Sequence, residues 1–286
     1  MSRQFALYGC GKAGLSVALA LKSAGWKVFG CDSRTEKSRE LGSQWLACPA
    51  INIPADLPPG IPIMVGVPEG ALAEADYRIA DNDRHIAGRI VFHLSGALPS
   101  RTLNLCRLSG AKVGSLHPLM ILPDPLTGAR NLKTATFAIE GREEAVSLLK
   151  KMAAAVSGKM FILSVRGKTL YHIAAVTASN HLISLLAESE DLLMRTGVPE
   201  EESLKAFQSL VEATVKNFFS EGPVQALTGP IERGEVQMIG SHLHALAKTP
   251  ASRDLYKAVA RKTLVLARKK HPERAEIYDE LEKVLE

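Results

Sequence analysis

The sequence predicts an α/β protein in which a doubly wound, mostly parallel sheet precedes an all-helical half. Over residues 1–164, short apolar runs typical of buried strands alternate with segments of helical periodicity. Such alternation is typical of a parallel sheet covered by helices on both faces. From residue 165 to residue 286, strand-like runs nearly disappear and helical segments follow one another. We therefore expect two domains, 1–164 and 165–286.

Glycine and proline residues set the limits of the predicted elements. Gly25 ends the first helix, prolines between residues 54 and 62 break the chain before the third strand, and Pro68 ends that strand. Strands are expected at 5–8, 26–31, 61–67, 89–94, 112–116, 134–140 and 159–163. Helices are expected between them at 15–22, 36–46, 70–76, 100–108 and 143–156. In the second domain, helices are expected at 168–196, at 200–219, from Pro230 onward, at 251–269 and at 272–285.

A glycine-rich segment with the spacing GxGxxG separates the first predicted strand from the first helix. In that context the first glycine permits a tight turn, the second lets the backbone approach a pyrophosphate, and the third lets helix and strand pack closely. The helix N-terminus adds unpaired N–H groups and the positive end of its dipole. We therefore expect a dinucleotide bound by Gly9, Cys10, Gly11, Lys12, Ala13 and Gly14, with Val67 and Pro68 from the loop after the third strand.

The residues after the second strand bear on the choice between NAD and NADP, which the sequence leaves open. Asp32 follows the glycines near the spacing of about 20 residues at which an acidic side chain meets the ribose 2′-hydroxyl. Its carboxylate would repel a 2′-phosphate, whereas Arg34 or Arg39 could bind one. Ser33 lies between Asp32 and Arg34 in the sequence, and we expect it to bind the cofactor as well. The expected cofactor is therefore NAD(P).

Polar side chains close two predicted strands at the sheet edge that would face the cofactor. His93 and Ser95 follow the fourth strand, where they either contact nicotinamide or substrate or form a strand-ending turn. His117 follows the fifth strand, and Pro118 biases it toward an extended conformation. A histidine there can exchange a proton with a carbonyl or imine. The alternative for His117 is a structural His–Pro turn.

A polar stripe runs along the helix predicted to start the second domain. At 100° per residue, Lys168, His172 and Ser179 share one face, and Asn180 lies on its flank. Because an unpaired buried polar group costs about 1–3 kcal/mol, such a stripe should face a wet cavity or a partner. We expect Lys168 to bind substrate and the other three residues to lie near the chemistry. The alternative is a hydrogen-bonded domain interface.

A later helix start offers a further anion site. Thr228 precedes Gly229-Pro230, where backbone N–H groups could meet an anion. Arg233 follows in the same segment and could hold a substrate carboxylate through two hydrogen bonds. The competing interpretation is a capped helix with a solvated ion pair.

Composition excludes several classes of function. The chain is 46% hydrophobic and 23% charged, with a net charge of +5, which is ordinary for a globular protein. Basic residues near its end alternate with acidic ones and lack interleaved aromatic side chains, which argues against nucleic-acid binding. We expect no signal peptide and no run able to cross a bilayer. The four cysteines show no metal-ligand spacing, so we expect no metal and a cytoplasmic location.

Several motifs together resemble one family over essentially the whole chain. They are GCGKAG at 9–14, VPEGAL at 67–72, HLSGAL at 93–98, SLHPL at 115–119, YHIAAVTASN at 171–180 and LTGPIERG at 227–234. The chain resembles the proteins that join a Rossmann-like domain to the domain of unknown function DUF2520. More distantly it is similar to pyrroline-5-carboxylate reductase, F420-dependent NADP reductases and β-hydroxyacid dehydrogenases. That wider group implies hydride transfer with NAD(P) and a homodimer formed through the helical domain.

The resemblance carries catalytic residues over only in part. The β-hydroxyacid dehydrogenases place a lysine four residues before an asparagine on the interdomain helix, whereas His172 stands at that spacing from Lys168 here. The pair His117-Pro118 is similar to the His-Pro-Met segment of prephenate dehydrogenases, whose histidine polarises the reacting oxygen. The resemblance therefore supports His117 more than a lysine acid.

These observations predict an NAD(P)-dependent oxidoreductase that acts on a small carbonyl, imine or alcohol, with a carboxylate on the substrate. His117 or His172 would be the proton donor, and Ser95, Ser179 and Asn180 would orient the substrate. The alternative is a non-catalytic dinucleotide-binding sensor or scaffold. The substrate and the direction of reaction do not follow from the sequence.

Overall fold

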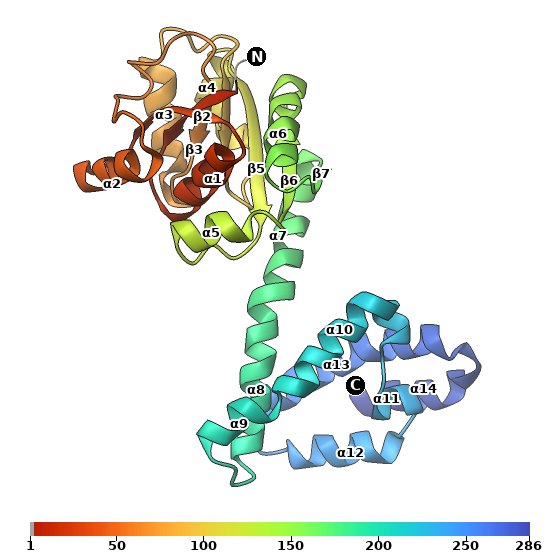
Figure 1. Cartoon of the computed structure of the whole chain (residues 1–286). Helices are drawn as coiled ribbons and strands as arrows, with labels where there is room; N and C mark the ends of the chain where they lie inside the picture. Colours follow the sequence, from red (N-terminus) through yellow and green to blue (C-terminus); the bar gives the residue numbers. More distant parts are fainter. Residues whose placement is uncertain (1–2) are drawn as a thin grey trace. The chain divides into compact units, whose positions relative to one another are not determined.

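The computed structural model describes residues 3–286, which form two compact units. The first unit extends to Ser179 and the second runs from Asn180 to Glu286. Figure 1 shows a sheet with its covering helices in the first unit and helices alone in the second. The last strand of the sheet ends at Ile162, while the first turns of the next helix belong to the first unit. The domain boundary between residues 164 and 165 stays a prediction.

The first unit is built on one seven-stranded sheet with the order β2-β1-β3-β4-β5-β6-β7 (Figure 1). Its strands are β1 Gln4–Tyr8, β2 Lys27–Asp32, β3 Ile63–Val65, β4 Ile90–His93, β5 Lys112–Leu119, β6 Thr136–Gly141 and β7 Met160–Ile162. All neighbouring pairs are parallel except β5 and β6, which are antiparallel. The fold class is therefore the one that the sequence predicts, a doubly wound and mostly parallel sheet.

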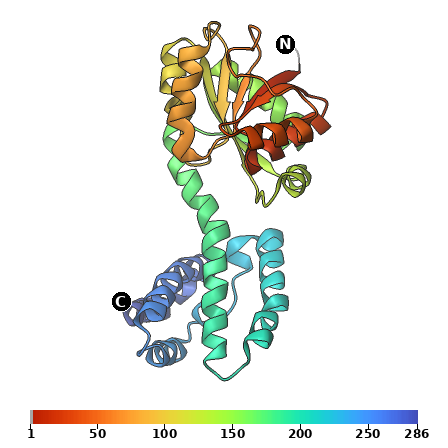
Figure 2. The ribbon, with the colours of Figure 1, turned by 90° about the vertical axis from the view of Figure 1, so that its left-hand side faces the viewer.

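Alternate residues of the central strands belong to two separate hydrophobic cores, one on each face of the sheet. On β1, Phe5 and Leu7 belong to one core and Ala6 and Tyr8 to the other. The first core includes α1 (Lys12–Ser23) and α6 (Glu143–Val156), and the second includes α3 (Leu72–Asn82). Figure 2 shows α3, in orange, and α1, in red, on opposite sides of the sheet. Burial on both faces explains why these strands are continuous apolar runs.

Several predicted elements differ in extent from those observed. The helix predicted at 100–108 is a 3₁₀ turn, Ser100–Thr102, followed by the short α4, Asn104–Leu108. The strand predicted at 61–67 shortens to Ile63–Val65, and the helix after it runs on to Asn82. The sequence analysis missed α5, Pro125–Asn131, where Asp124 caps the helix by accepting from the backbone N–H of Leu126 and Thr127. The remaining helix between strands is α2, Glu36–Leu46, as predicted.

Three glycine backbones meet where β1, α1 and β3 come together. A Cβ placed on Gly66, just after β3, would lie 2.8 Å from both the Cα of Gly14 and the carbonyl oxygen of Gly9. Gly9 itself has φ of +103°, a conformation that favours glycine. The sheet edge and the start of α1 can approach this closely only because none of the three residues carries a side chain.

The second unit is entirely helical within the residues described. Its helices are α8 Leu182–Met194, α9 Glu200–Ala206, α10 Gln208–Gln225, α11 Pro230–Arg233, α12 Val236–Ala245, α13 Pro250–Lys270 and α14 Ala275–Leu285. Ile239, Leu264, Tyr278 and Leu281 form the centre of its core. The predicted helix at 200–219 is two helices, and Gly222, with φ of +80°, kinks α10 before Pro223.

The helix predicted at 168–196 is present but is not uniform. It consists of α7, Lys168–Val176, a π-helical turn at Thr177–His181, and α8. With its preceding 3₁₀ turn, the segment Val165–Met194 is long enough, and over part of its length apolar enough, to cross a membrane by length and composition. The expectation that no run meets this criterion is therefore wrong, because apolar residues outweigh the scattered polar ones in that part of the segment. The expectation that the chain binds no membrane stays a prediction.

The glycine contact at the end of β3 yields a stability prediction. Replacing Gly66 with Ala should lower the free energy of unfolding by about 1–3 kcal/mol, because the added methyl group overpacks against backbone that cannot give way. Gly70 is the matched control, since a Cβ there would meet nothing within 4 Å. Urea unfolding of both variants measures the effect. Equal stability of Gly66→Ala and Gly70→Ala would contradict the described packing.

Candidate active site

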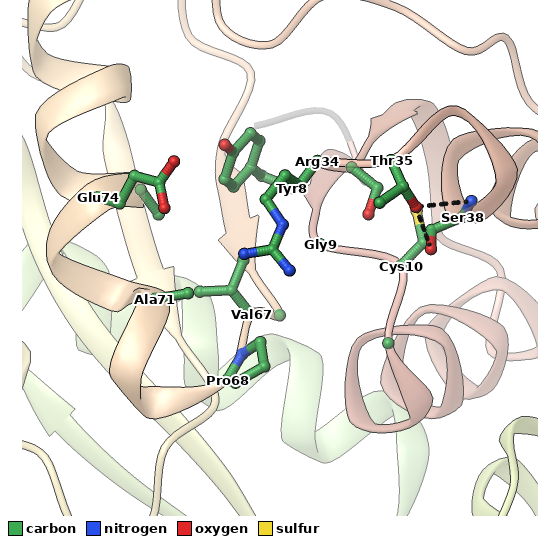
Figure 3. Close-up of a pocket in the computed structure, with 14 residues that line it drawn as sticks. Tyr8, Gly9, Cys10, Arg34, Thr35, Ser38, Val67, Pro68, Ala71 and Glu74 are labelled. Atoms are coloured by element: carbon green, nitrogen blue, oxygen red, sulfur yellow. Dashed lines mark hydrogen bonds between the residues drawn. The ribbon is translucent and has the colours of Figure 1, made fainter.

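A pocket of about 210 Å³ opens at the carboxyl ends of β1, β2 and β3 (Figure 3). Gly9, Cys10 and Gly11 form one wall, and Val67 and Pro68 belong to the facing loop. Ligands of open α/β sheets bind at this edge, outside the carboxyl ends of the strands. The pocket therefore lies where the glycine spacing predicts a dinucleotide.

The glycine loop lines this pocket with Gly9, Cys10 and Gly11, of which only Cys10 carries a side chain. Gly11 is the N-cap residue of α1, makes no side-chain cap, and is followed by a first turn without acidic residues. The first N–H groups of a helix have no intrahelical partner, so they remain available to an anion. The Lys12 side chain is exposed in the same turn, while Ala13 and Gly14 pack inward. This arrangement fits a pyrophosphate.

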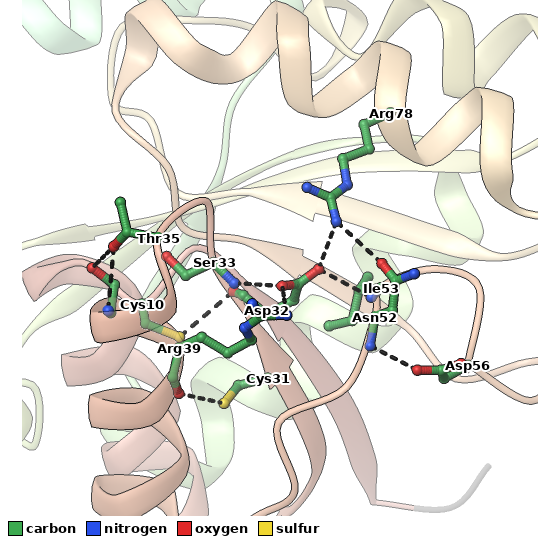
Figure 4. Close-up of polar contacts among 11 residues, drawn as sticks. Cys10, Cys31, Asp32, Ser33, Thr35, Arg39, Asn52, Ile53, Asp56 and Arg78 are labelled. Carbon is green, nitrogen blue, oxygen red and sulfur yellow. Dashed lines mark hydrogen bonds and ion pairs between the residues drawn. The ribbon is translucent and has the colours of Figure 1, made fainter.

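Asp32 is engaged within the protein rather than exposed to the pocket. Its side chain is only 1% exposed and accepts hydrogen bonds from the backbone N–H of Ser33 at 2.8 Å and of Ile53 at 3.1 Å (Figure 4). The Arg78 guanidinium donates to it at 3.2 Å, and Arg39 lies 4.0 Å away. These donors occupy both carboxylate oxygens. The contact between Asp32 and an adenosine ribose stays a prediction.

Next to Asp32, the pocket wall is formed by hydroxyl groups and one cation. Ser33, Arg34, Thr35 and Ser38 line it, and the Arg34 side chain reaches across toward Val67 (Figure 3). Thr35 is the N-cap of α2 and accepts from the backbone N–H of Ser38 at 3.3 Å, while its hydroxyl donates to that of Ser38 at 2.8 Å. Hydroxyl donors and an arginine at a helix N-terminus suit a phosphate monoester.

A second polar cluster lies further along the sheet, at the end of β4, in the second half of β5 and at the start of α7. His93 pairs in register with Ser115, and the Lys168 Nζ donates to the Ser115 hydroxyl. Tyr171 shares a hydrogen bond of 2.6 Å with Nδ1 of His117, and their rings meet edge to face. Lys168 is 1% exposed, so this ammonium group is buried.

The side chains of two histidines lie close to Gly96. A Cβ on Gly96 would lie 2.7 Å from Nε2 of His117 and 3.0 Å from Nδ1 of His172. The His172 Nδ1 is buried and has no hydrogen-bond partner. Two imidazole nitrogens therefore face the loop at Gly96, and neither is engaged in a hydrogen bond within the described residues.

Burial changes the proton affinity of this cluster. It lowers the pKa of Lys168 to about 8 and raises that of Tyr171 to about 12. Burial, together with the nearby charge of Lys168, lowers the pKa of His93 and of His117 to about 4. At neutral pH both of these histidines are therefore uncharged, and Lys168 remains mostly protonated.

Glu69 connects the pocket to the polar cluster. It directly follows Pro68 of the pocket wall, and its carboxylate accepts a hydrogen bond from the Ser95 hydroxyl. Ser95 in turn accepts from the backbone N–H of Leu98 at 2.9 Å. An elongated ligand that enters beside Gly9 would thus run toward Ser95 and Gly96.

Four other predicted site residues come from the π-helical turn and from the second unit. Ser179 and Asn180 fall in the π-helical turn, where Asn180 is exposed. In the second unit, Thr228 is exposed and Arg233 donates to Glu235 at 2.6 Å. Their predicted contacts with substrate stay predictions.

Sequence reasoning did not single out Tyr171, Ser115 or Glu69. Tyr171 lies between Lys168 and His172 in one helical turn, and Ser115 is two residues before His117 on one strand. The alternation of β5 could have identified Ser115, because residues two apart point to the same face of a sheet. Glu69 had no such signal, since its partner Ser95 comes from another loop.

Comparison with known proteins places these elements in context. Residues 4–118 match the model of a Rossmann-like domain, and residues 135–263 match that of the domain of unknown function DUF2520. No curated protein sequence matches the chain.

Several solved structures share the fold. A Thermotoga maritima protein is 24% identical, with a TM-score of 0.77 over 93% of this chain and 99% of its own. A Bacteroides fragilis protein, to which an NADP oxidoreductase activity is ascribed, is 23% identical, with a TM-score of 0.71 over 95% and 98%. The reductive aminase of Aspergillus terreus, in complex with NADPH and ethyl-5-oxohexanoate, is 17% identical, with a TM-score of 0.62 over 100% and 93%.

The buried His93 predicts a pH dependence of stability. Its Nε2 bonds to the carbonyl oxygen of Pro99 at 3.2 Å, and its Nδ1 accepts from the backbone N–H of Ser95 at 3.1 Å, so the neutral ring is fully satisfied. Because its pKa is about 4 when folded and 6.5 otherwise, the unfolded chain binds the proton more tightly. The unfolding free energy should therefore rise between pH 4 and pH 6.5, by about 3 kcal/mol from this group.

Urea titrations at several pH values test this dependence. The variant His93→Gln should lose much of the slope between pH 4 and pH 6.5, whereas His85→Gln, at an exposed position, should keep it. Identical slopes in all three proteins would show that His93 is not held neutral by burial.

Proposed function

We propose that this chain, a member of the family that joins a Rossmann-like domain to a DUF2520 domain, is an NADP-dependent oxidoreductase acting on a small carbonyl, imine or alcohol. The observation that carries the proposal is the sheet edge itself, where a backbone-lined anion pocket leads to a buried Lys168 beside His117 and Tyr171. The similarity of this fold to that of a reductive aminase solved with NADPH supports the same proposal. A carboxylate on the substrate is part of the proposal.

The preference for NADP over NAD rests on the residues that follow β2. The carboxylate of Asp32, which would favour a free 2′-hydroxyl, is buried under Arg78 and the N–H of Ile53. The groups that line the pocket instead are Arg34 and the hydroxyls of Ser33 and Thr35. A dianionic 2′-phosphate would find a cation and several donors there.

The glycine loop and the N-terminus of α1 would hold the pyrophosphate, and NADPH would supply the hydride when bound. The side chains of the protein would then have to supply the proton and orient the substrate. Lys168 is the charged group whose pKa, about 8, lies nearest neutral pH, which suits a general acid. His117 is neutral, so its Nε2 would serve as a hydrogen-bond partner for the reacting oxygen or nitrogen, oriented through Nδ1 by Tyr171.

We further propose that two copies associate through the helical unit and that the protein works in the cytoplasm. Neither α8 nor α10 has a buried residue, and they expose large apolar side chains, including Ile183, Leu210 and Phe219. A second copy would cover such apolar area. Free thiols at all four cysteines suit a reducing compartment. Light scattering of the protein without detergent should give a dimer, whereas a monomer or a membrane-bound protein would contradict this part.

Coenzyme choice gives the first functional prediction. Replacing Arg34 with Ala should weaken NADPH binding by about tenfold or more, since a charge-assisted contact contributes about 1.5–3 kcal/mol, and should change NADH binding little. Arg84→Ala is the control for general charge, because Arg84 is an exposed arginine outside the pocket. Fluorescence titration measures both ligands. An equal loss for NADH and NADPH, or none for either, would refute the 2′-phosphate site.

The proton-supply assignment predicts a separation of binding from turnover. Lys168→Met should lower kcat about 100-fold or more while NADPH affinity is retained, and Tyr171→Phe should lower kcat less, because general acid groups contribute about 10²–10⁴-fold. In wild type, the rate of reduction should fall above pH 8 as Lys168 loses its proton. Lys133→Met, at an exposed position, is the control.

These rates are measured with a panel of small carbonyl compounds, with and without an added amine. If Lys168→Met and Lys133→Met turn over equally, Lys168 is not the acid. If wild type binds NADPH but reduces no compound in the panel, the non-catalytic sensor becomes the better account.

A further inference from the structure

Three of the four cysteines form one buried cluster beneath the cofactor pocket. Cys10 lies in the glycine loop, Cys31 on β2 and Cys48 just after α2, and they are 6%, 0% and 9% exposed. All three are free thiols. The only other cysteine, Cys106, belongs to the core on the opposite face of the sheet. All three also belong to the apolar core on their face of the sheet.

Cys31 is the centre of this cluster. The neighbouring thiols of Cys10 and Cys48 lower the pKa of Cys31, with a smaller contribution from the charge of Arg39. The same contacts raise the pKa of Cys10 and of Cys48. Cys31 is therefore the most acidic thiol of the three.

Gly42 of α2 makes the contact between Cys10 and Cys31 possible. A Cβ on Gly42 would collide with the Sγ of Cys10 and would lie 3.3 Å from the Sγ of Cys31. Both sulfur atoms therefore border the same small space. Each also bonds to backbone, Cys10 to the carbonyl oxygen of Asp32 at 3.6 Å and Cys31 to that of Arg39 at 3.8 Å (Figure 4).

Only Cys10 of these three lines the cofactor pocket. A small oxidant that enters the empty pocket would meet Cys10 first, and a bound dinucleotide would cover it. Cys10 also belongs to the loop whose amides are proposed to hold the pyrophosphate. A covalent bond from Cys10 to Cys31 would draw this loop toward β2 and away from the ligand.

We propose that Cys10 and Cys31 form an intramolecular disulfide when the cofactor-free protein meets a peroxide, and that this bond weakens dinucleotide binding. The effect on binding rests on the proposed function, whereas the disulfide does not. The Cys10 sulfur attacks one peroxide oxygen while its thiol proton passes to the departing hydroxide, which leaves as water, and a sulfenic acid results. The Cys31 sulfur then attacks that sulfur, and its thiol proton leaves with the sulfenic hydroxyl as a second water. Two thiols are thereby oxidised to one disulfide, and one peroxide is reduced to two waters.

Peptide mapping of the full chain after hydrogen peroxide treatment and thiol alkylation tests the site. We expect residues 10 and 31 to be joined in the free protein and protected by excess NADPH. The Cys106→Ser variant should form the same bond, whereas Cys31→Ser should not. A Cys31–Cys48 bond, or sulfinic acid at Cys10 without any cross-link, would overturn the assignment.

NADPH titrations before and after oxidation test the consequence. Oxidised wild type should bind NADPH about tenfold or more weakly, a change of about 1.4 kcal/mol, and dithiothreitol should restore affinity. The Cys31→Ser variant should show no such loss, and its circular dichroism shows whether it is folded. If the disulfide maps correctly but affinity is unchanged, the regulatory part fails. If the reduced wild type does not bind NADPH at all, the proposed function fails while the disulfide mapping still stands.

Discussion

The close approach of backbone at Gly9, Gly14 and Gly66 is the constraint on which the proposed site depends. It brings the end of β1, the first turn of α1 and the end of β3 within van der Waals contact, with no room for a Cβ on Gly66. Two consequences follow from this contact. The uncapped N–H groups of α1 open directly onto the pocket, and the loop after β3 is held so that Glu69 reaches Ser95. The position of the anion site and its link to the polar cluster thus share one origin in packing.

Burial gives the polar cluster its chemical character. At the surface, a lysine, a histidine and a tyrosine titrate near their usual pKa values. At neutral pH the lysine would then be fully charged, each histidine partly charged and the tyrosine neutral. Here desolvation brings the pKa of Lys168 down to about 8 and keeps His93 and His117 neutral. The cluster therefore contains an ammonium proton that can be given up near neutral pH, close to two histidines that orient rather than ionise.

The architecture was predictable because its signals are local. The helix at 36–46 and the helix at 143–156 are observed with the predicted bounds, since each has a clear capping or acidic start and an apolar stripe. The parallel pairing of most strands follows from their alternation with helices. By contrast, the engagement of Asp32 by Arg78 joins residues from different elements, and no pattern of spacing reveals it. The hydrogen bond between Tyr171 and His117 is equally non-local. The sequence could therefore predict polar residue types at this part of the sheet but not their partners.

Calorimetric titration of the wild-type chain with NADP⁺ and with NAD⁺ is the decisive experiment, because it reports whether the pocket accepts a dinucleotide and whether the wall beside Asp32 selects the 2′-phosphate. We expect saturable binding of NADP⁺, with NAD⁺ binding at least about tenfold more weakly. Tighter binding of NAD⁺ would contradict the role given to Arg34, and no heat with either ligand would contradict the dinucleotide site itself.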